Sequence, residues 1–314
     1  MRTRRTLIAL VLGLAAMGGT LPAVAVATDR PQNGQVTFGR FDPELGDWSI
    51  WAANPDGTHQ RRLTHVPSFF SDWSPDGQRI AFDFADDTGV HIATMDSHGR
   101  NMRQLTYGEG IQELPKWSPD GRWIAFNAST QFPDEPGFHT DLWIMRADGS
   151  HKRRLTRDSF DTEPVFSPDG RRIAFARITD AVEFQVAIYV VRTDGTHLRE
   201  VVPPTFGLEH PDWSPDGRWI TFNIAPEAVP GAAVMAVHPD GNGLRVIRRS
   251  NDRFELFKPV WSPDGRKLLV GCFDVRAQND RICIMDANGR NLRVVLSTPE
   301  PLNFPAWGTH PLKR

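Results

Sequence analysis

The chain has 314 residues, of which 39% are hydrophobic and 24% are charged, and its formal net charge at pH 7 is −2. A chain of this length and composition can bury a large apolar core. It lacks the excess of basic residues that a phosphate-binding face requires, so nucleic acid is not an expected partner.

The first 27 residues predict an export signal. Three arginines within the first five residues precede an apolar stretch, Leu7–Met17, and Ala25-Val26-Ala27 supplies a small-residue cleavage pattern. Cleavage would start the mature chain at Thr28 and move its formal charge to about −5, because the leader carries three of the positive charges and no negative one. We therefore expect an exported protein, secreted or in the periplasm or cell envelope, with no membrane span after cleavage. The alternative is an uncleaved membrane anchor. Such an anchor would need a longer apolar segment, and glycines and a proline interrupt this one.

After the leader, the tetrapeptide Ser-Pro-Asp-Gly occurs five times, each time behind an aromatic residue and ahead of a short apolar run. These aromatic residues lie 44 to 49 residues apart along the chain, at Trp73, Trp117, Phe166, Trp213 and Trp261. A period of this length, with several strands in each unit, is typical of a β-propeller.

The unit around Trp117 predicts four strands. Glu113–Trp117 is short and extended, because a residue before proline is pushed toward β geometry. A Ser-Pro-Asp-Gly turn leads into Arg122–Asn127, whose apolar residues alternate as in a half-buried strand. Asp141–Arg146 is the third strand, and a turn at Asp-Gly joins it to the fourth, Lys152–Thr156.

The two ends of the mature chain predict how the ring closes. Asn33–Phe38 matches the second strand of a unit and has no first strand before it, whereas Leu302–Trp307 matches a first strand and has no second strand after it. Residues 28–314 are thus expected to form one all-β domain, a six-bladed β-propeller of four-stranded antiparallel blades. The last strand and the first three would share one blade, which removes the exposed sheet edges.

The pattern of WSPDG, IAF, DG and LT segments resembles the WD40-like (PD40) repeat of the TolB-like propellers, over essentially the whole mature chain. The resemblance implies a propeller whose first strands line a central channel. The tight SPDG and DG turns would lie on one face, here called the turn face.

The opposite face, here called the loop face, would carry the connections of variable length. Those between second and third strands are Ala128–Thr140, Arg177–Phe184, Ala225–Gly231 and Asp274–Asp280. Loops on a rigid scaffold usually carry binding. We therefore predict a ligand site on the loop face, around the mouth of the channel.

Polar residues next to the proline of each first strand are expected to converge at this mouth: Glu113, Glu163, Glu209, His210 and Lys258. Three carboxylates and an imidazole could hold a divalent cation, which would make Glu113, Glu163, Glu209 and His210 the metal ligands. Alternatively, these residues cap strand ends and line a wet channel, with Lys258 balancing one negative charge.

Aromatic residues near the start of the first strands lie on the same predicted face: Phe70, Tyr107, Phe160, Phe206 and Phe257. They would form an adhesive ring around the mouth, suited to a peptide or a sugar. The alternative is that they seal the gaps between neighbouring blades.

No nucleophile elbow, zinc-protease motif or phosphate loop occurs in the sequence. The favoured hypothesis is a non-enzymatic, monomeric propeller that binds a protein, a peptide or a cell-envelope glycan and has no cofactor, apart from a possible divalent cation. The alternative is a metal-assisted lyase or hydrolase that acts on an acidic polysaccharide. Oligogalacturonate lyases with related repeats are understood to use a His-rich metal site in the channel, and this chain offers one channel histidine there, His210.

Two cysteines, Cys272 and Cys283, flank the loop of a predicted hairpin. Antiparallel neighbours would bring them within reach of each other, and an oxidising destination makes a disulfide possible. Two small buried side chains are the alternative.

Overall fold

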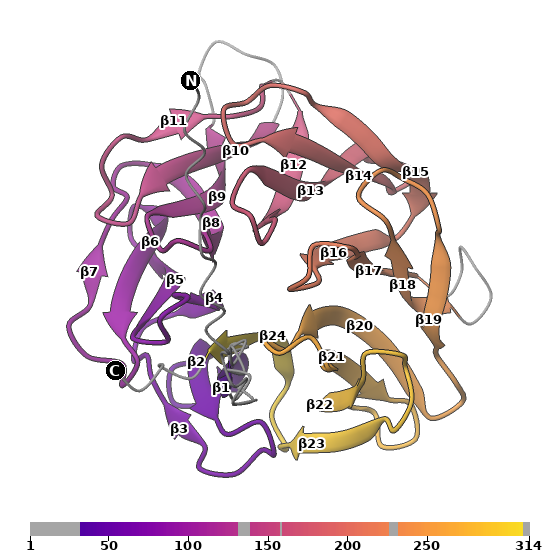
Figure 1. The fold of residues 1–314 in the computed structure, drawn as a ribbon. Helices are drawn as coiled ribbons and strands as arrows, with labels where there is room; N and C mark the ends of the chain where they lie inside the picture. The colour runs from indigo at the N-terminus through magenta and orange to yellow at the C-terminus, as the bar shows by residue number, and fades with distance from the viewer. Residues whose placement is uncertain (1–31, 131–138, 158, 226–231, 310–314) are drawn as a thin grey trace, which may run out of the picture.

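The computed structural model describes residues 32–130, 139–157, 159–225 and 232–309 (Figure 1). Their regular structure is entirely β, in strands that follow one another around a ring. The predicted export signal, residues 1–27, lies outside the described residues. No helix in the described ranges has the length and hydropathy to cross a bilayer.

The strands form six blades, each with a first strand beside the channel and a fourth strand at the rim (Figure 1). Blades 1 and 2 consist of β24 (Leu302–Thr309), β1 (Asn33–Asp42), β2 (Asp47–Ala53) and β3 (Arg61–Arg62), then β4 (Ser68–Trp73), β5 (Arg79–Asp86), β6 (Gly89–Asp96) and β7 (Arg103–Gln104). Blades 3 and 4 consist of β8 (Gly110–Trp117), β9 (Trp123–Thr130), β10 (His139–Arg146) and β11 (Arg153–Arg154), then β12 (Phe160–Phe166), β13 (Arg172–Asp180), β14 (Gln185–Arg192) and β15 (Arg199–Phe206). Blades 5 and 6 consist of β16 (Leu208–Trp213), β17 (Ile220–Ile224), β18 (Ala232–Val237) and β19 (Arg245–Arg249), then β20 (Phe254–Trp261), β21 (Lys267–Asp274), β22 (Asn279–Asp286) and β23 (Arg293–Ser297).

Blade 1 joins the two ends of the described chain, as the sequence predicts. Strand β24 pairs antiparallel with β1, and Val36 lies opposite Trp307 in the register. The order β24-β1-β2-β3 completes a four-stranded sheet, so the propeller is shut by hydrogen bonds between segments that are distant in sequence.

The fourth strands of blades 1 to 3 are shorter than predicted. In blade 3 the predicted strand Lys152–Thr156 is reduced to Arg153–Arg154, because the Thr156 hydroxyl accepts the N–H of Leu142 at 3.0 Å. The equivalent threonines of blades 1 and 2 accept third-strand N–H groups at 2.9 and 2.8 Å. A threonine hydroxyl thus takes the place of a backbone carbonyl as acceptor for the third strand, and the backbone ladder between the third and fourth strands ends there. Blades 4 to 6 have no threonine at this position, and their fourth strands have 5 to 8 residues.

Arginines hold neighbouring blades together. The guanidinium of Arg79 lies 4.6 Å from the ring centroid of Trp117 in the next blade, and Arg172 lies 4.9 Å from that of Trp213. At the rim, Arg61 donates to the carbonyl of Ser97 at 2.6 Å. These contacts add to the apolar core, whose largest fully buried side chains include a phenylalanine from the second strand of most blades: Phe38, Phe82, Phe175 and Phe222.

The Ser-Pro-Asp-Gly segments form tight turns, as expected. In blade 3 the hydroxyl of Ser118 donates to Asp120 at 2.6 Å, and the N–H of Gly121 donates to the carbonyl of Ser118 at 2.9 Å. Gly121 has a φ of 67°, which a glycine adopts without strain. These bonds fix the end of each first strand.

Cys272 and Cys283 form a disulfide between β21 and β22, with an S–S distance of 1.99 Å. Both residues are completely buried. The structure thus selects the disulfide over two reduced, buried side chains.

Candidate functional site

In each blade, the register between the first and second strands shifts at a bulge in the first strand. The bulged residue lies three positions before the last aromatic residue of that strand. In four blades the residue at this position has a positive φ: Leu114 56°, Glu163 57°, His210 57° and Lys258 51°. A left-handed conformation costs a non-glycine residue about 1–2 kcal/mol. Four strained residues therefore surround one point on the axis.

At Leu114, His210 and Lys258, the freed N–H group of the bulge is bound by a side chain of the preceding blade. The N–H of Leu114 donates to Asp83 at 3.0 Å, and the N–H of Lys258 donates to Asn223 at 3.1 Å. Buried backbone donors need such partners. These three bulges are thus fixed by the blade before them as well as by their own strands.

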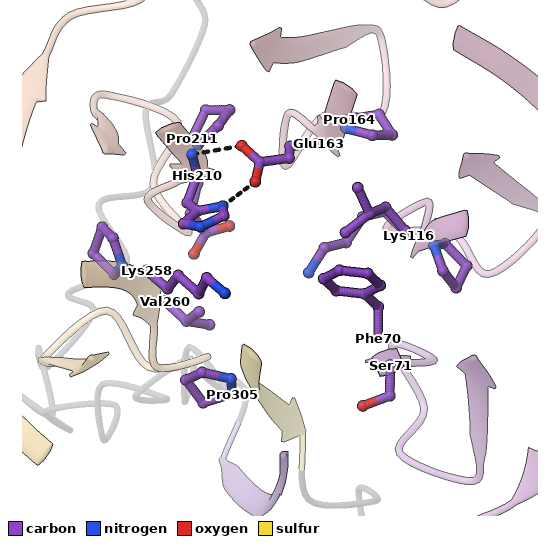
Figure 2. A pocket seen from close by; sticks show the side chains of 14 residues that line it. Phe70, Ser71, Lys116, Glu163, Pro164, His210, Pro211, Lys258, Val260 and Pro305 are labelled. Carbon is purple, nitrogen blue, oxygen red and sulfur yellow. Dashed lines mark hydrogen bonds and ion pairs between the residues drawn. The ribbon is translucent and has the colours of Figure 1, made fainter. Parts of the chain in front are cut away.

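The bulges surround a cavity, here called the mouth pocket, whose lining includes Phe70, Leu114, Glu163, His210 and Lys258 (Figure 2). These residues precede the end of each first strand, so the pocket lies toward the loop face. Its volume is about 70 Å³. This space admits the tip of one side chain, because a water molecule in the liquid occupies about 30 Å³.

Glu163 and His210 bind each other across two blades (Figure 2). The Glu163 carboxylate pairs with Nδ1 of the His210 ring and also accepts the backbone N–H of His210 at 2.6 Å. Burial alone would raise the pKa of Glu163, but its bonds with His210 and the charge of Lys258 lower it. Glu163 is therefore an ionised carboxylate at neutral pH.

Lys258 contributes a cation to the same pocket. Burial lowers the pKa of Lys258 to about 7, although Glu163, Glu209 and Asp280 act in the opposite direction. The ammonium group therefore gains and loses its proton near neutral pH, which is unusual for lysine.

The four predicted metal ligands contact other protein groups in this structure. Within the described ranges no three His, Cys, Asp or Glu side chains lie close enough to hold one ion. Glu163 and His210 bind each other, Glu209 lies 3.8 Å from Nε2 of His210, and Glu113 accepts a hydrogen bond from Asn127 at 3.1 Å. Burial raises the pKa values of Glu113 and Glu209.

The predicted aromatic ring is also not gathered at the mouth. Of its five members, Phe70 lines the mouth pocket. Tyr107 is 69% exposed and donates its hydroxyl to a carbonyl of its own blade, and Phe206 packs edge-on against another phenylalanine. Phe160 lies 5.6 Å from a histidine ring, and Phe257 packs over a second-strand glycine. Around the mouth pocket, Glu163, His210 and Lys258 are therefore set among apolar residues, mainly prolines, with Phe70 as the aromatic member.

The model of the PD40 family, described as the TolB beta propeller domain, matches residues 134–311, which is more than half of the chain. This chain belongs to that family. The crystal structure of TolB from Acinetobacter baumannii superimposes on this TolB-type propeller with a TM-score of 0.73 and 20% identity, over 87% of this chain and 66% of that chain. The similarity supports the fold.

Two curated relatives have a higher sequence identity, over a smaller part of the chain. An uncharacterized protein of Agrobacterium fabrum is 32% identical over 185 residues, which cover 55% of this chain and 61% of the relative. A protein of Chlorobium chlorochromatii named as a TolB homolog is 30% identical over 145 residues, which cover 45% of this chain and 30% of the relative. The propeller thus spans less than two thirds of either relative.

Below the mouth pocket, three charged residues narrow the channel of this TolB-type propeller. Asp72, Lys116 and Asp212 each come immediately before the last aromatic residue of a first strand. Nζ of Lys116 lies 3.2 Å from Oδ1 of Asp72. Burial raises the pKa of Asp212 to about 6, although Lys116 acts in the opposite direction. This group, here called the constriction, was not predicted from the sequence.

Beyond the constriction the channel widens toward the turn face into a cavity of about 500 Å³, here called the vestibule. Its wall consists of the last aromatic residues of the first strands, Trp73, Trp117, Phe166, Trp213, Trp261 and Trp307, and of the turn prolines, Pro75, Pro119, Pro168, Pro215 and Pro263. These residues were not predicted from the sequence to line a binding site. The larger cavity of the channel therefore lies on the face opposite to the predicted one.

Proposed function

We propose that this TolB-type propeller is an exported, envelope-associated binding protein that takes a protein or peptide at the mouth pocket. The observation that carries the proposal is the charged cluster of Glu163, His210 and Lys258, which is held on strained backbone. Export rests on the N-terminal signal pattern, and protein binding is consistent with membership of the TolB propeller family.

The backbone conformation and the burial of Lys258 are unfavourable for the stability of the fold. Three charged or polar residues adopt a left-handed conformation, and the lowered pKa of Lys258 means that its charged form is disfavoured in the folded state. Strain and perturbed pKa values gather at functional sites, because groups that only destabilise a fold are readily replaced. This supports a binding role for the mouth.

The size of the mouth favours a macromolecule over a free small ligand. Small-molecule sites usually enclose roughly 300–1,000 Å³, whereas the mouth pocket has about 70 Å³. A partner would rest on the loop face and insert the tip of one polar side chain. There it would meet the Glu163 carboxylate, the Lys258 amine and the ring of Phe70 (Figure 2).

A site-specific photo-cross-link tests this proposal. Mature protein with p-benzoylphenylalanine in place of Phe70 is mixed with the native envelope fraction and irradiated. The matched control carries the same residue in place of His197, which is exposed in a DG turn on the turn face. We expect a protein adduct from position 70 that Glu163→Gln and Lys258→Met each weaken. Equal adducts from both positions, or none from position 70, would contradict the proposal.

A further inference from the structure

The vestibule is much larger than the mouth pocket and lies at the other end of the channel. Its volume of about 500 Å³ falls within the range of sites that enclose a ligand. Lys116 and Asp212 line both cavities and so lie between them, whereas Asp72 lines the vestibule. An occupant of the vestibule therefore does not need the mouth to be empty.

The wall of the vestibule is rigid, flat and largely apolar. Five indole rings and one phenyl ring alternate around it with the prolines of the SPDG turns. The turn bonds at Ser118 and Gly121 repeat around the ring and fix these prolines. Aromatic grooves of this kind take proline-rich segments in the polyproline conformation, which lose little entropy on binding.

The floor of the vestibule carries a net negative charge. Lys116 forms an ion pair with Asp72. Within the described ranges no basic nitrogen lies within 4.0 Å of the Asp212 carboxylate, whose Oδ2 accepts the backbone N–H of Trp261 at 2.7 Å. Two carboxylates therefore share one ammonium group, which leaves one negative charge at the end of an aromatic cavity.

We propose that the vestibule is a second binding site, separate from the mouth pocket, for an extended proline-containing peptide that directs an arginine side chain to Asp212. The guanidinium would pair with the carboxylate, and its methylene stem would pack on the indole faces, as cationic side chains do beside tryptophan. The flanking prolines would rest against the proline and tryptophan residues of the wall.

Titration of the mature protein with acetyl-Pro-Pro-Arg-Pro-Pro-amide tests this site, with calorimetry and intrinsic tryptophan fluorescence as readouts. Five of the ten tryptophans line the vestibule, so occupancy should change the emission. The matched peptide carries glutamine in place of arginine. We expect saturable binding of the arginine peptide and at least tenfold weaker binding of the glutamine peptide. Equal affinity of the two peptides would overturn the proposal.

Three variants locate the peptide. Asp212→Asn should weaken binding at least tenfold, and Thr309→Lys, which puts a positive charge on the vestibule wall, should weaken it several-fold even if Asp212→Asn does not fold. Glu209→Gln, beside the mouth pocket, should leave the affinity unchanged. Weaker binding in Glu209→Gln together with normal binding in Thr309→Lys would place the peptide at the mouth and overturn the proposal.

Other occupants give distinct results. Spermidine that binds as tightly as the arginine peptide would overturn the peptide assignment. Self-association without peptide, lost in Thr309→Lys and detected by sedimentation velocity, would assign the vestibule to a second copy of the chain and also overturn it.

Discussion

Replacement of Lys258 by methionine should stabilise the fold at pH 6. Methionine has a similar length and no charge, so Lys258→Met removes the ammonium group without opening a cavity. The pKa of Lys258 is lowered from 10.5 to about 7, mainly by burial. At about 1.4 kcal/mol per pKa unit, the charged form is disfavoured by up to ~5 kcal/mol in the folded state. Because Lys258 is only half-buried, solvent screening reduces the expected gain to about 2 kcal/mol.

The sign of the pH dependence follows from the lowered pKa. Between pH 7 and 10.5 the folded state binds fewer protons at Lys258 than the unfolded state does, so this residue makes stability rise with pH. The destabilisation is complete below pH 7 and disappears as the pH approaches 10.5. The gain in Lys258→Met should therefore be largest at pH 6 and vanish near pH 10.5.

Urea unfolding of both proteins at pH 6, 8 and 10 measures this difference. The control is Lys267→Met, because Lys267 is 44% exposed and its ion pair with Asp286 lies at the surface. That change should alter the unfolding free energy by less than about 1 kcal/mol. If Lys258→Met is less stable than wild type at pH 6, or if the difference does not depend on pH, the argument about the buried charge is wrong.

Three further changes test other parts of the fold. Thr106→Val removes the hydroxyl that accepts a third-strand N–H, and should lower the unfolding free energy by about 1–2 kcal/mol in urea. Loss of the disulfide in a Cys272→Ala, Cys283→Ala double variant should lower it by about 3 kcal/mol, as estimated from the chain entropy of a closed loop with a sequence separation of 11. Gly308→Ala would place a Cβ 2.6 Å from the Trp73 indole and should cost about 1–3 kcal/mol of stability by thermal unfolding, because blade 1 must then shift against blade 2.

Each of these changes has an outcome that contradicts its reasoning. A neutral Thr106→Val would mean that the third-strand N–H finds another acceptor, and Thr58→Val, whose hydroxyl bonds only within an exposed turn, is its control. Unchanged stability of the reduced wild-type protein would show that the disulfide does not constrain the unfolded chain. Wild-type thermal stability in Gly308→Ala would argue against close packing between blades 1 and 2.

Most of the fold was predictable from the sequence, because it repeats. The spacing of the SPDG turns predicted the blades, and the unmatched segments at the two ends predicted the pairing of β24 with β1. The length of the outer strands was not predictable from propensity. The hydroxyl of Thr156 and its equivalents replaces a ladder bond, and this substitution depends on side-chain geometry.

The candidate site was predicted in part. Polar residues beside the prolines led to Glu163, His210 and Lys258 at the mouth, as the structure has them. The left-handed bulges that orient these residues could not be predicted from the sequence. A positive φ is usually indicated by glycine, and the bulged positions have none. Asp72 and Asp212 were not predicted. The sequence did carry a signal for them, because each is a charged residue directly before the last tryptophan of a first strand.

The pairing of β24 with β1 also affects how the protein is synthesised. Residues near Val36 are made long before their partners near Trp307, so blade 1 waits for almost the entire chain to be translated. Until then β1 presents an unpaired edge, which can recruit strands from other chains. We therefore expect closure of blade 1 to be the last step of folding, and the step most exposed to aggregation.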